Sequence, residues 1–423
     1  MRYAGVNGVM MTELSVLHIS TADQIGGSAR SAYNIHDGLR RRGFRSRMLV
    51  GTMASSDPDV GLISSGALKF LDRLADHAMA RLSLPYVYFP SSRRLLRHPW
   101  FVEADIVQIY NTHGGYFSHT VLPAVSSGKH AVWRLSDMWP MTGHCVYPDE
   151  CRGWLDGCSP CPYLDRYVPL RSDRAGFLWQ QKKRTYGRSE LHIVAPTNWI
   201  MDAAQQSPLL GRFPCRLIPN GVDMDVFRPV PKGTARGALD VPGDRTALLF
   251  IAHVLQNNPR KGTQYVPEIV SSLWEAGRRD ILLMLVGQGE PEWIESVPCP
   301  VWRRDLVRDD ELLALVYSAA DVNLHPAVVE NFPNTVLEAM ACGLPSVAFD
   351  VGGVSDGVVD GVTGRLVQAG DVHSFVRAVE AIVDSKELRQ KMSAGGIEFV
   401  RENMTVQKQA DAFADLCRSV ISR

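Results

Sequence analysis

The sequence predicts an α/β protein made of two doubly wound domains, each a parallel sheet covered by helices. Short apolar runs alternate with amphipathic stretches along most of the chain, as strand–helix–strand units do. This pattern occurs twice, and Arg228–Thr234, with two prolines and a glycine, separates the halves. The 423 residues, 45% of them apolar, are enough for two cores. We expect the two domains to face each other across an interdomain cleft, lined by the carboxyl ends of both sheets.

The elements follow from apolar periodicity and from turn residues at the ends of each run. We expect strands at Ser15–Ser20, Ser46–Val50, Ile106–Tyr110, Ala131–Arg134, His192–Ala195, Arg216–Ile218, Ala247–Ala252, Ile281–Val286, Val322–His325, Pro345–Phe349 and Gly364–Val367. We expect helices at Ser28–Arg42, Tyr265–Ala276, Asp309–Ala319, Thr335–Ala341 and Val372–Asp384.

The composition excludes several classes of protein. Lys and Arg together number 45, as do Asp and Glu, which argues against a dedicated nucleic-acid binder. No apolar run approaches the roughly 18 residues of a membrane-spanning helix. Residues 1–11 lack the apolar core of a signal peptide. We therefore expect a loose leader, with Met10 or Met11 as alternative starts, and a cytoplasmic protein.

Glycines and basic residues follow several of the predicted strands. Gly26 and Gly27 come between the first strand and a helix, and form either an anion-binding loop or an ordinary tight turn. In the second half, a strand leads to His253 and then to Arg260 and Lys261, which either neutralise a diphosphate or are exposed loop residues. The next strand ends at Gly287 and Gly289, where a flat base can approach the backbone.

Two carboxylates, Glu330 and Glu338, are separated by seven residues that include a proline and two asparagines. Pro333 and Asn334 indicate that a helix begins near residue 334. Glu330 then lies in the preceding loop and Glu338 about one turn into the helix. The free N–H groups of the helix start lie between them, which predicts an anion site flanked by two hydroxyl-binding carboxylates.

At this point the sequence shows a resemblance. The stretch Ser318–Gly353, with Glu330-Asn-Phe-Pro-Asn-Thr-Val-Leu-Glu338 at its centre, closely resembles the signature of glycosyltransferase family 4. Members are retaining enzymes that use nucleotide sugars and have the GT-B fold. Ile218–Asp223, Lys261-Gly262, Val286–Glu290 and the Gly26-Gly27 loop occur in the family's order, so the resemblance covers nearly the whole chain.

The resemblance implies roles and domains. It places the acceptor-binding domain at residues 1–228, the nucleotide-sugar domain at 229–404 and a helix that returns to the first domain at 405–423. The ribose would bind Glu338, the donor sugar Glu330, and the diphosphate Arg260 and Lys261. The implied catalytic residues are Glu330, His113 and Lys261. The implied donor-binding residues are Gly26, Gly27, His253, Arg260, Lys261, Gly287, Gly289, Asn331, Phe332, Asn334, Thr335 and Glu338.

Three features depart from the family or could be misread. The family often has an arginine after the first strand of the second domain, where this chain has Ala252-His253. The family's histidine in the first domain is either His113 or, in another alignment, replaced by Tyr110. Asp223-Met-Asp225 spells the motif of metal-dependent transferases, but we interpret it as part of a loop. We expect no catalytic metal, because cations and a helix dipole stabilise the leaving diphosphate.

Four of the eight cysteines fall within 17 residues: Cys145, Cys151, Cys158 and Cys161. In a reducing compartment such clustering indicates metal before disulfides, and the final Cys-x-x-Cys is typical of a structural zinc site. Free thiols and disulfides are the alternatives. The insert, residues 137–165, is similar to one in bacterial polysaccharide glycosyltransferases of this family. Residues expected to line the acceptor site are Arg30, Asp137, Trp139 and His144.

Residues 67–101 are less regular, with an amphipathic helix at Ala67–Leu84 followed by a basic segment. They form either a solvated surface insertion or a basic, apolar face that rests on an anionic membrane. We therefore predict a retaining transferase that moves a sugar from a nucleoside-diphosphate sugar to a glycan or lipid-linked glycan in cell-surface polysaccharide assembly. The alternatives are an epimerase of the same fold and a catalytically silent nucleotide-sugar or zinc-binding partner protein.

Overall fold

The computed structural model describes residues 13–422 and divides them into two compact units. The first unit contains the residues before Thr197, Ile200–Ile218 and those from Gln409 onward. The second contains Thr197–Trp199 and Pro219–Lys408. The predicted loose leader and its alternative starts, Met10 and Met11, lie outside the described residues. Across residues 13–422, no helix combines the length and apolar character needed to span a membrane.

The first unit contains a parallel sheet of seven strands in the order β3-β2-β1-β4-β5-β6-β7. The strands are β1 Ser15–Ala22, β2 Arg45–Thr52, β3 Val60–Leu62, β4 Ile106–Ile109, β5 His130–Arg134, β6 Leu191–Ala195 and β7 Cys215–Leu217. The helices are α1 Gly27–Arg40, α2 Gly66–Arg81, α3 Pro90–Leu95, α4 Pro99–Glu103, α5 Leu122–Ser126, α6 Ala175–Tyr186, α7 Asn198–Gln206 and, from Gln409 on, α14 Val406–Ile421.

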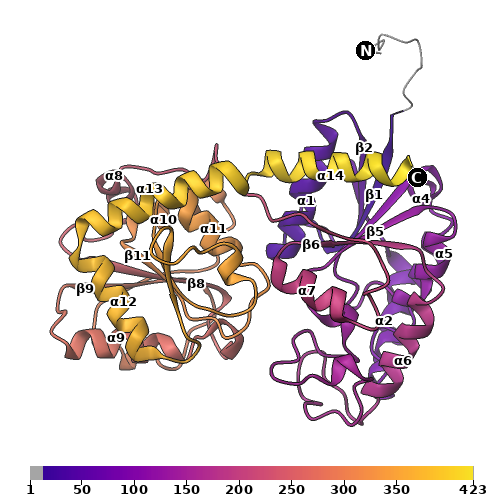
Figure 1. Cartoon of the computed structure of the whole chain (residues 1–423), viewed down its shortest axis with the longest axis horizontal. Coiled ribbons are helices and arrows are strands. Elements are labelled where there is room, and N and C mark those ends of the chain that lie inside the picture. The colour runs from indigo at the N-terminus through magenta and orange to yellow at the C-terminus, as the bar shows by residue number, and fades with distance from the viewer. Residues whose placement is uncertain (1–12, 423) are drawn as a thin grey trace. The chain divides into compact units, whose positions relative to one another are not determined.

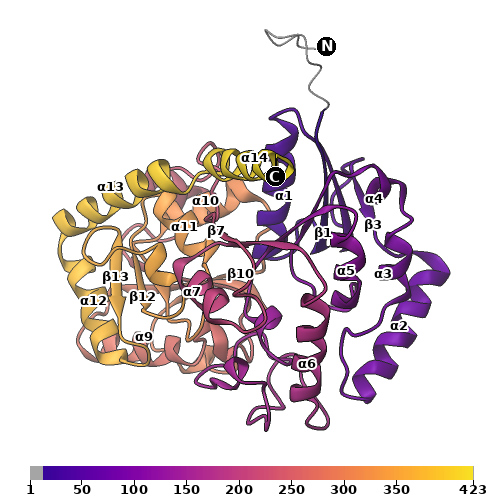
Figure 2. The same cartoon turned by 45° about the vertical axis from the view of Figure 1, so that its right-hand side comes forward.

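The C-terminal helix α14 packs beside α1 (Figures 1 and 2). Its buried face, with Phe413, Ala414 and Cys417, joins the core formed by α1 and the sheet. Gly38 permits the close approach, because a Cβ atom there would lie 2.5 Å from Cβ of Ala410. The end of the chain is therefore an integral part of the first unit.

The second unit repeats the plan with six parallel strands in the order β10-β9-β8-β11-β12-β13. The strands are β8 Thr246–Val254, β9 Ile281–Gln288, β10 Val301–Arg304, β11 Val322–His325, β12 Ser346–Phe349 and β13 Gly364–Val367. The helices are α8 Lys232–Leu239, α9 Tyr265–Glu275, α10 Asp310–Ala319, α11 Asn334–Ala341, α12 Val372–Asp384 and α13 Lys386–Asn403. One apolar core lies under α9 and α12, and another under α8, α10 and α11.

The fold class predicted from the sequence is confirmed, since both units are parallel sheets covered by helices. The prediction omitted the short strands β3 and β10 and the long helix α13. The units also divide near residue 219, before the predicted linker at 228–234. The reason is packing: Val222 and Phe227 are buried in the core of the second unit, and the N–H of Val222 donates to the carbonyl of Met404 at 2.8 Å.

Candidate active site

In the second sheet the strand order reverses between β8 and β11, which are hydrogen-bonded neighbours. Loops that follow two such strands diverge at their carboxyl ends, and this is where doubly wound sheets bind ligands. The loop after β8 carries Arg260 and Lys261 in a single 3₁₀ turn, Pro259–Lys261. The loop after β11 carries Glu330. The topology therefore brings together Lys261 and Glu330, which are 69 residues apart in the sequence.

The three charged side chains meet at this point. Lys261 Nζ pairs with Glu330 Oε2, and Arg260 Nη1 lies 3.7 Å from the same oxygen. Burial opposes ionisation of Glu330, but the charges of Lys261 and Arg260 outweigh it and lower its pKa to about 2. Glu330 is thus a buried carboxylate whose charge is held by two cations.

Glycines fix the backbone around this cluster. Gly262 has φ +73°, and a Cβ atom there would lie 1.7 Å from the carbonyl oxygen of Pro326, so the two loops touch directly. Gly352 has φ +55°, and its Cβ would lie 1.9 Å from the carbonyl oxygen of Glu330. The N–H of Gly353 donates to that same carbonyl at 3.1 Å. The backbone carrying Glu330 is therefore enclosed by neighbouring loops.

Helix α11 begins at Asn334, as predicted, so Glu330 precedes it and Glu338 lies one turn in. No side chain caps its start, which leaves the first-turn N–H groups to be satisfied by other partners. Glu338 is buried and accepts a hydrogen bond from the Tyr317 hydroxyl at 2.8 Å. That bond fixes one carboxylate oxygen and orients the other.

Other predicted donor residues surround the same helix. Asn331 Oδ1 accepts from the Thr197 hydroxyl at 3.0 Å, and Asn334 Oδ1 accepts from Asn220 Nδ2 at 2.6 Å. Phe332 is buried in the core and supports the loop from beneath, while Thr335 is half-buried in the first turn of the helix. The sequence did not assign roles to Thr197, Asn220 or Tyr317, because their partners lie far away along the chain.

His325 is a further residue that sequence reasoning passed over. It ends β11 and is buried. Burial and the charge of Lys261 lower its pKa to about 4, so it is neutral near pH 7. Its Nε2 finds no hydrogen-bond partner among the described residues. The sequence feature that could have indicated His325 is its position directly before Pro326, at the end of a predicted strand.

The predicted base-binding segment follows β9. Gly287 has φ +150°, and a Cβ atom there would lie 2.0 Å from the carbonyl oxygen of Ala252. Gly289, at φ +81°, lies over Gln256. His253 is exposed near the end of β8. Gly287 and Gly289 therefore allow the segments after β8 and β9 to approach each other closely. Contact of these glycines with the base of a nucleotide stays a prediction.

The first sheet reverses its order between β1 and β4, and polar residues again gather at those strand ends. Gly26 (φ +87°) precedes α1 and Gly27 begins it. The Ser28 hydroxyl donates to Asn111 Oδ1 at 2.8 Å and lies 2.7 Å from the Ser136 hydroxyl. Arg30 extends from the first turn of α1. The start of α1 is therefore tied to the loops after β4 and β5.

His113 and Asp137 form a buried pair at this edge, with Nε2 and Oδ2 2.7 Å apart. Because a carboxylate only accepts, Nε2 carries the hydrogen in the neutral imidazole, and Nδ1 is left as an acceptor. Nδ1 has no partner in the part of the chain that the structure describes. Tyr110, the alternative in the prediction, is instead a core residue: its hydroxyl lies 3.0 Å from His18 Nδ1 and accepts from Gln108 at 2.9 Å.

Three further expectations have structural counterparts. Trp139 and His144 are only 2% and 1% exposed, so their contact with an acceptor stays a prediction. Asp223 Oδ1 accepts from the N–H of Asp225 at 3.0 Å, a local turn that agrees with the interpretation of this motif as a loop. Cys145, Cys151, Cys158 and Cys161 are free thiols whose surroundings are described below.

Comparison with known proteins now identifies the second unit. Residues 245–385 match the family model described as "Glycosyl transferases group 1". The matched segment belongs to this family. It contains the Arg260–Lys261–Glu330 cluster, Gly262, Gly352 and Glu338, so the family suggested by the sequence signature is confirmed.

Relatives and solved structures agree with this assignment. A D-inositol 3-phosphate glycosyltransferase from Streptosporangium roseum is 30% identical over 55% of this chain and 58% of its own length. A putative colanic acid biosynthesis glycosyl transferase, WcaC, from Escherichia coli is 29% identical over 51% of each chain. The chain thus spans little more than half of these curated relatives.

Nearly the whole chain aligns with solved structures of the same fold. Sucrose-phosphate synthase from Thermosynechococcus elongatus aligns with a TM-score of 0.68 at 19% identity, covering 97% of this chain and 100% of that one. Anabaena HepE, solved in complex with UDP, aligns with a TM-score of 0.65 at 16% identity, covering 96% and 100%. At these identities the likeness establishes the GT-B fold alone.

Proposed function

We propose that the chain transfers a sugar from a nucleoside-diphosphate sugar to a glycan or lipid-linked glycan, with retention, during assembly of a cell-surface polysaccharide. The observation that carries the proposal is the convergence of Arg260, Lys261 and Glu330 at the switch point of a glycosyl transferases group 1 domain. Two cations can bind a diphosphate, and an adjacent carboxylate can accept hydrogen bonds from the hydroxyls of a sugar ring. A substrate that carries both groups side by side therefore suits this cluster.

The proposed chemistry assigns separate parts of the donor to separate groups. Arg260 and Lys261 take the diphosphate, together with the uncapped start of α11, so that charge developing on the leaving group meets donors that are already in place. Their charge is then shared with the phosphates, which leaves Glu330 free to accept from hydroxyls of the donor sugar. Glu338, oriented by Tyr317, accepts from the ribose hydroxyls. This scheme uses no catalytic metal.

The comparisons support this reading and direct the first choice of donor. A solved structure of similar fold holds UDP, and one relative is named for colanic acid biosynthesis. UDP-sugars are therefore the first donors to test, followed by GDP- and ADP-sugars. The glycan that receives the sugar would bind the first unit. There His113 Nδ1, beside Asp137, can accept a hydrogen bond and has no partner among the described residues.

The test measures donor binding by the full chain, with Glu338→Ala as the site variant and Glu311→Ala, an exposed acid on α10, as the control. We expect one nucleotide class to raise the melting temperature of the parent and the control but not of Glu338→Ala. Failure of all three classes to bind would refute the proposal in favour of a silent zinc-binding partner protein, whereas binding without transfer to any acceptor would favour a silent nucleotide-sugar-binding protein. Conversion of the donor into an epimer without an acceptor, followed by NMR, would instead favour the epimerase.

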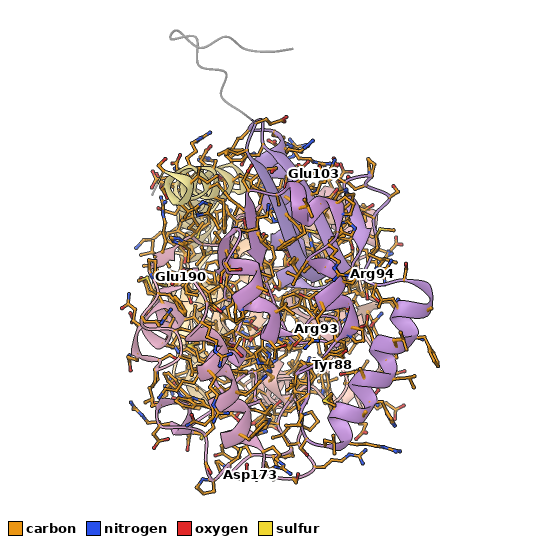
Figure 3. All side chains as sticks on the ribbon, turned by 90° about the vertical axis from the view of Figure 1, so that its right-hand side faces the viewer. Tyr88, Arg93, Arg94, Glu103, Asp173 and Glu190 are labelled. Atoms are coloured by element: carbon orange, nitrogen blue, oxygen red, sulfur yellow. The ribbon has the colours of Figure 1, made fainter. Side chains whose placement is uncertain are left out.

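We also propose that the protein works at the cytoplasmic face of a membrane, through helix α2 and the segment after it. Phe70, Leu71 and Leu74 on α2 are 62%, 50% and 52% exposed. Arg93 and Arg94 lie in the last turn of the short helix α3, and the Arg93 guanidinium lies 5.5 Å from the centre of the Tyr88 ring. Figure 3 labels Tyr88, Arg93 and Arg94. Exposed apolar residues next to arginines suit an anionic bilayer surface.

Sedimentation with lipid vesicles tests this surface separately from catalysis. We expect the protein to bind vesicles that contain anionic lipid, and to bind them less as salt increases, because surface charge is screened. Phe70→Ser with Leu74→Ser should abolish binding, while Val102→Ser, an equally exposed apolar residue of α4, should not. Equal binding by neutral and anionic vesicles, or by all variants, would contradict the proposal.

A further inference from the structure

The cysteine-rich insert of the first unit folds around a small cavity. All four clustered cysteines and His144 line it, although they come from positions up to 17 residues apart. The cavity measures about 20 Å³, room for one occupant the size of a water molecule. Of the lining donors, Cys145, Cys158 and His144 are buried. Five side chains of types that bind metal therefore line the same cavity.

Backbone N–H groups already point at two of the sulfur atoms. The N–H of Gly143 donates to Cys158 Sγ at 3.2 Å, and that of Gly153 donates to Cys151 Sγ at 3.4 Å. A hydrogen bond from a backbone N–H stabilises a thiolate more than a thiol, because it favours the charged form. Both sulfurs therefore already have a backbone donor that a metal-bound thiolate could keep.

His144 is oriented as a metal-ligating histidine is. Its Nδ1 lies 2.7 Å from the carbonyl oxygen of Val168, and its Nε2 lies 3.3 Å from Cys161 Sγ. Since the carbonyl can only accept, Nδ1 carries the hydrogen and Nε2 presents its lone pair to the sulfur. Two ligands of one tetrahedral zinc ion, with Zn–S near 2.3 Å and Zn–N near 2.0 Å, lie about 3.5 Å apart. The observed contact is close to that separation.

A buried lysine lies beside the cluster: burial lowers the pKa of Lys182 to about 7, although the nearby Cys158 and Cys145 act to raise it. Lys182 Nζ donates to the carbonyls of Trp139 at 2.6 Å and Thr142 at 2.9 Å, and lies 3.4 Å from the centre of the Trp139 ring. Among the described residues no carboxylate pairs with it within 4.0 Å, and a buried charge requires compensation. A zinc ion with three thiolates and one imidazole carries a single negative charge, which would balance Lys182.

We propose that the insert binds one zinc ion through its cysteine thiolates, with Nε2 of His144 as a ligand. Cys161 contacts His144, and Cys158 belongs to the same Cys-x-x-Cys turn, so these three occupy three positions. Cys145 or Cys151 completes the tetrahedron. In the described residues no three His, Cys, Asp or Glu side chains yet surround a single ion position, so binding requires side-chain rotations within the insert. The inference is independent of the proposed transferase activity.

The first experiment measures zinc in the purified full chain by elemental analysis, after dialysis against metal-free buffer with a reductant. We expect about one zinc ion per chain, released when a mercurial reagent titrates the thiols. Cys158→Ser and Cys161→Ser should lose it, whereas Cys215→Ser, outside the insert, should retain it. A chelator should lower the melting temperature of the parent but not of Cys161→Ser.

The part played by His144 has its own test. His144→Ala should lose zinc, and His144→Cys should regain it, because a thiolate can replace imidazole at a tetrahedral position. Cobalt substitution gives a second reading, since its visible spectrum reports the number of thiolates and should indicate three in the parent. A four-thiolate cobalt spectrum of the parent itself would overturn the histidine ligand.

The wider proposal fails if the parent contains no zinc and cannot bind it after reduction. Intact-mass measurement then separates the remaining alternatives, because each disulfide lowers the mass by two hydrogens and free thiols leave it unchanged. Should Cys161→Ser not fold, the mercurial titration of the parent alone decides the outcome: zinc released in proportion to modified thiols supports the site, and none released overturns it.

Discussion

Removing the Lys261 ammonium should destabilise the second unit by an amount that depends on pH. Lys261→Met keeps the length of the side chain but leaves Glu330, which is 7% exposed, with Arg260 at 3.7 Å as its remaining close cation. The pKa of Glu330 falls from its ordinary value of 4.5 to about 2 in the folded protein. That difference corresponds to about 3 kcal/mol of stability near neutral pH, and Lys261 is the largest favourable contributor.

The sign follows from the direction of the shift. Because the folded state lowers the pKa of Glu330, its contribution is fully present above pH 4.5 and is lost as pH falls towards 2. Lys261→Met should therefore cost up to about 3 kcal/mol near pH 7. The loss of unfolding free energy should be smaller at acidic pH, because Glu330 of the variant becomes protonated there and a neutral carboxyl group requires no cation for compensation.

Calorimetry of the full chain measures this as a lower melting temperature of the second unit. Lys232→Met is the matched control, since Lys232 pairs with Asp321 but is 45% exposed, and such pairs contribute about 1 kcal/mol or less. Adding Glu330→Gln to Lys261→Met should restore most of the loss by removing the unpaired charge. A deficit that is the same at pH 7 and pH 4, or equal to that of the control, would refute the reasoning.

Three further predictions concern the candidate site. Tyr317→Phe removes the hydrogen bond that orients Glu338 and should weaken donor binding about tenfold, as measured by calorimetric titration; unchanged affinity would mean that Glu338 does not hold the donor. Gly262→Ala should prevent the close contact with Pro326 and abolish donor binding, whereas alanine at Gly277, where no atom lies within 4 Å of the new Cβ, should lower stability only, through its positive φ. Asp137→Asn changes the partner of His113 and should reduce kcat about tenfold or more with little change in the donor Kd; an equal loss in both would assign the pair to folding.

The architecture was predictable because its signal is local. Each strand of the second sheet except β10 coincides with a short apolar run, and β10, Val301–Arg304, was missed because it contains two arginines and no buried residue. Helix α13 was missed for a similar reason: only three of its 18 residues are buried, so its apolar periodicity is weak. Both elements lie at the margin of a core, where few side chains are buried and a regular pattern of apolar and polar residues is not needed.

The candidate site was predictable only in part, since a motif gives residue types and not their partners. The sequence placed Glu330 in a loop and Glu338 one turn into a helix, as observed. It gave no means of seeing that Lys261 neutralises Glu330 or that Tyr317 holds Glu338, because those contacts depend on the order of strands in the sheet. That order is fixed by packing between segments distant in sequence.

The polar clusters of the two units lie at equivalent positions in their sheets. In the first unit the cluster follows β1, β4 and β5, and in the second it follows β8 and β11, each beside the reversal of strand order. His325 ends β11 and His113 follows β4, the strands on the far side of the reversal in their sheets. Each has one ring nitrogen without a partner among the described residues. A buried imidazole with an unused nitrogen costs free energy. We infer that each of these nitrogens is available to a ligand at the carboxyl end of its sheet.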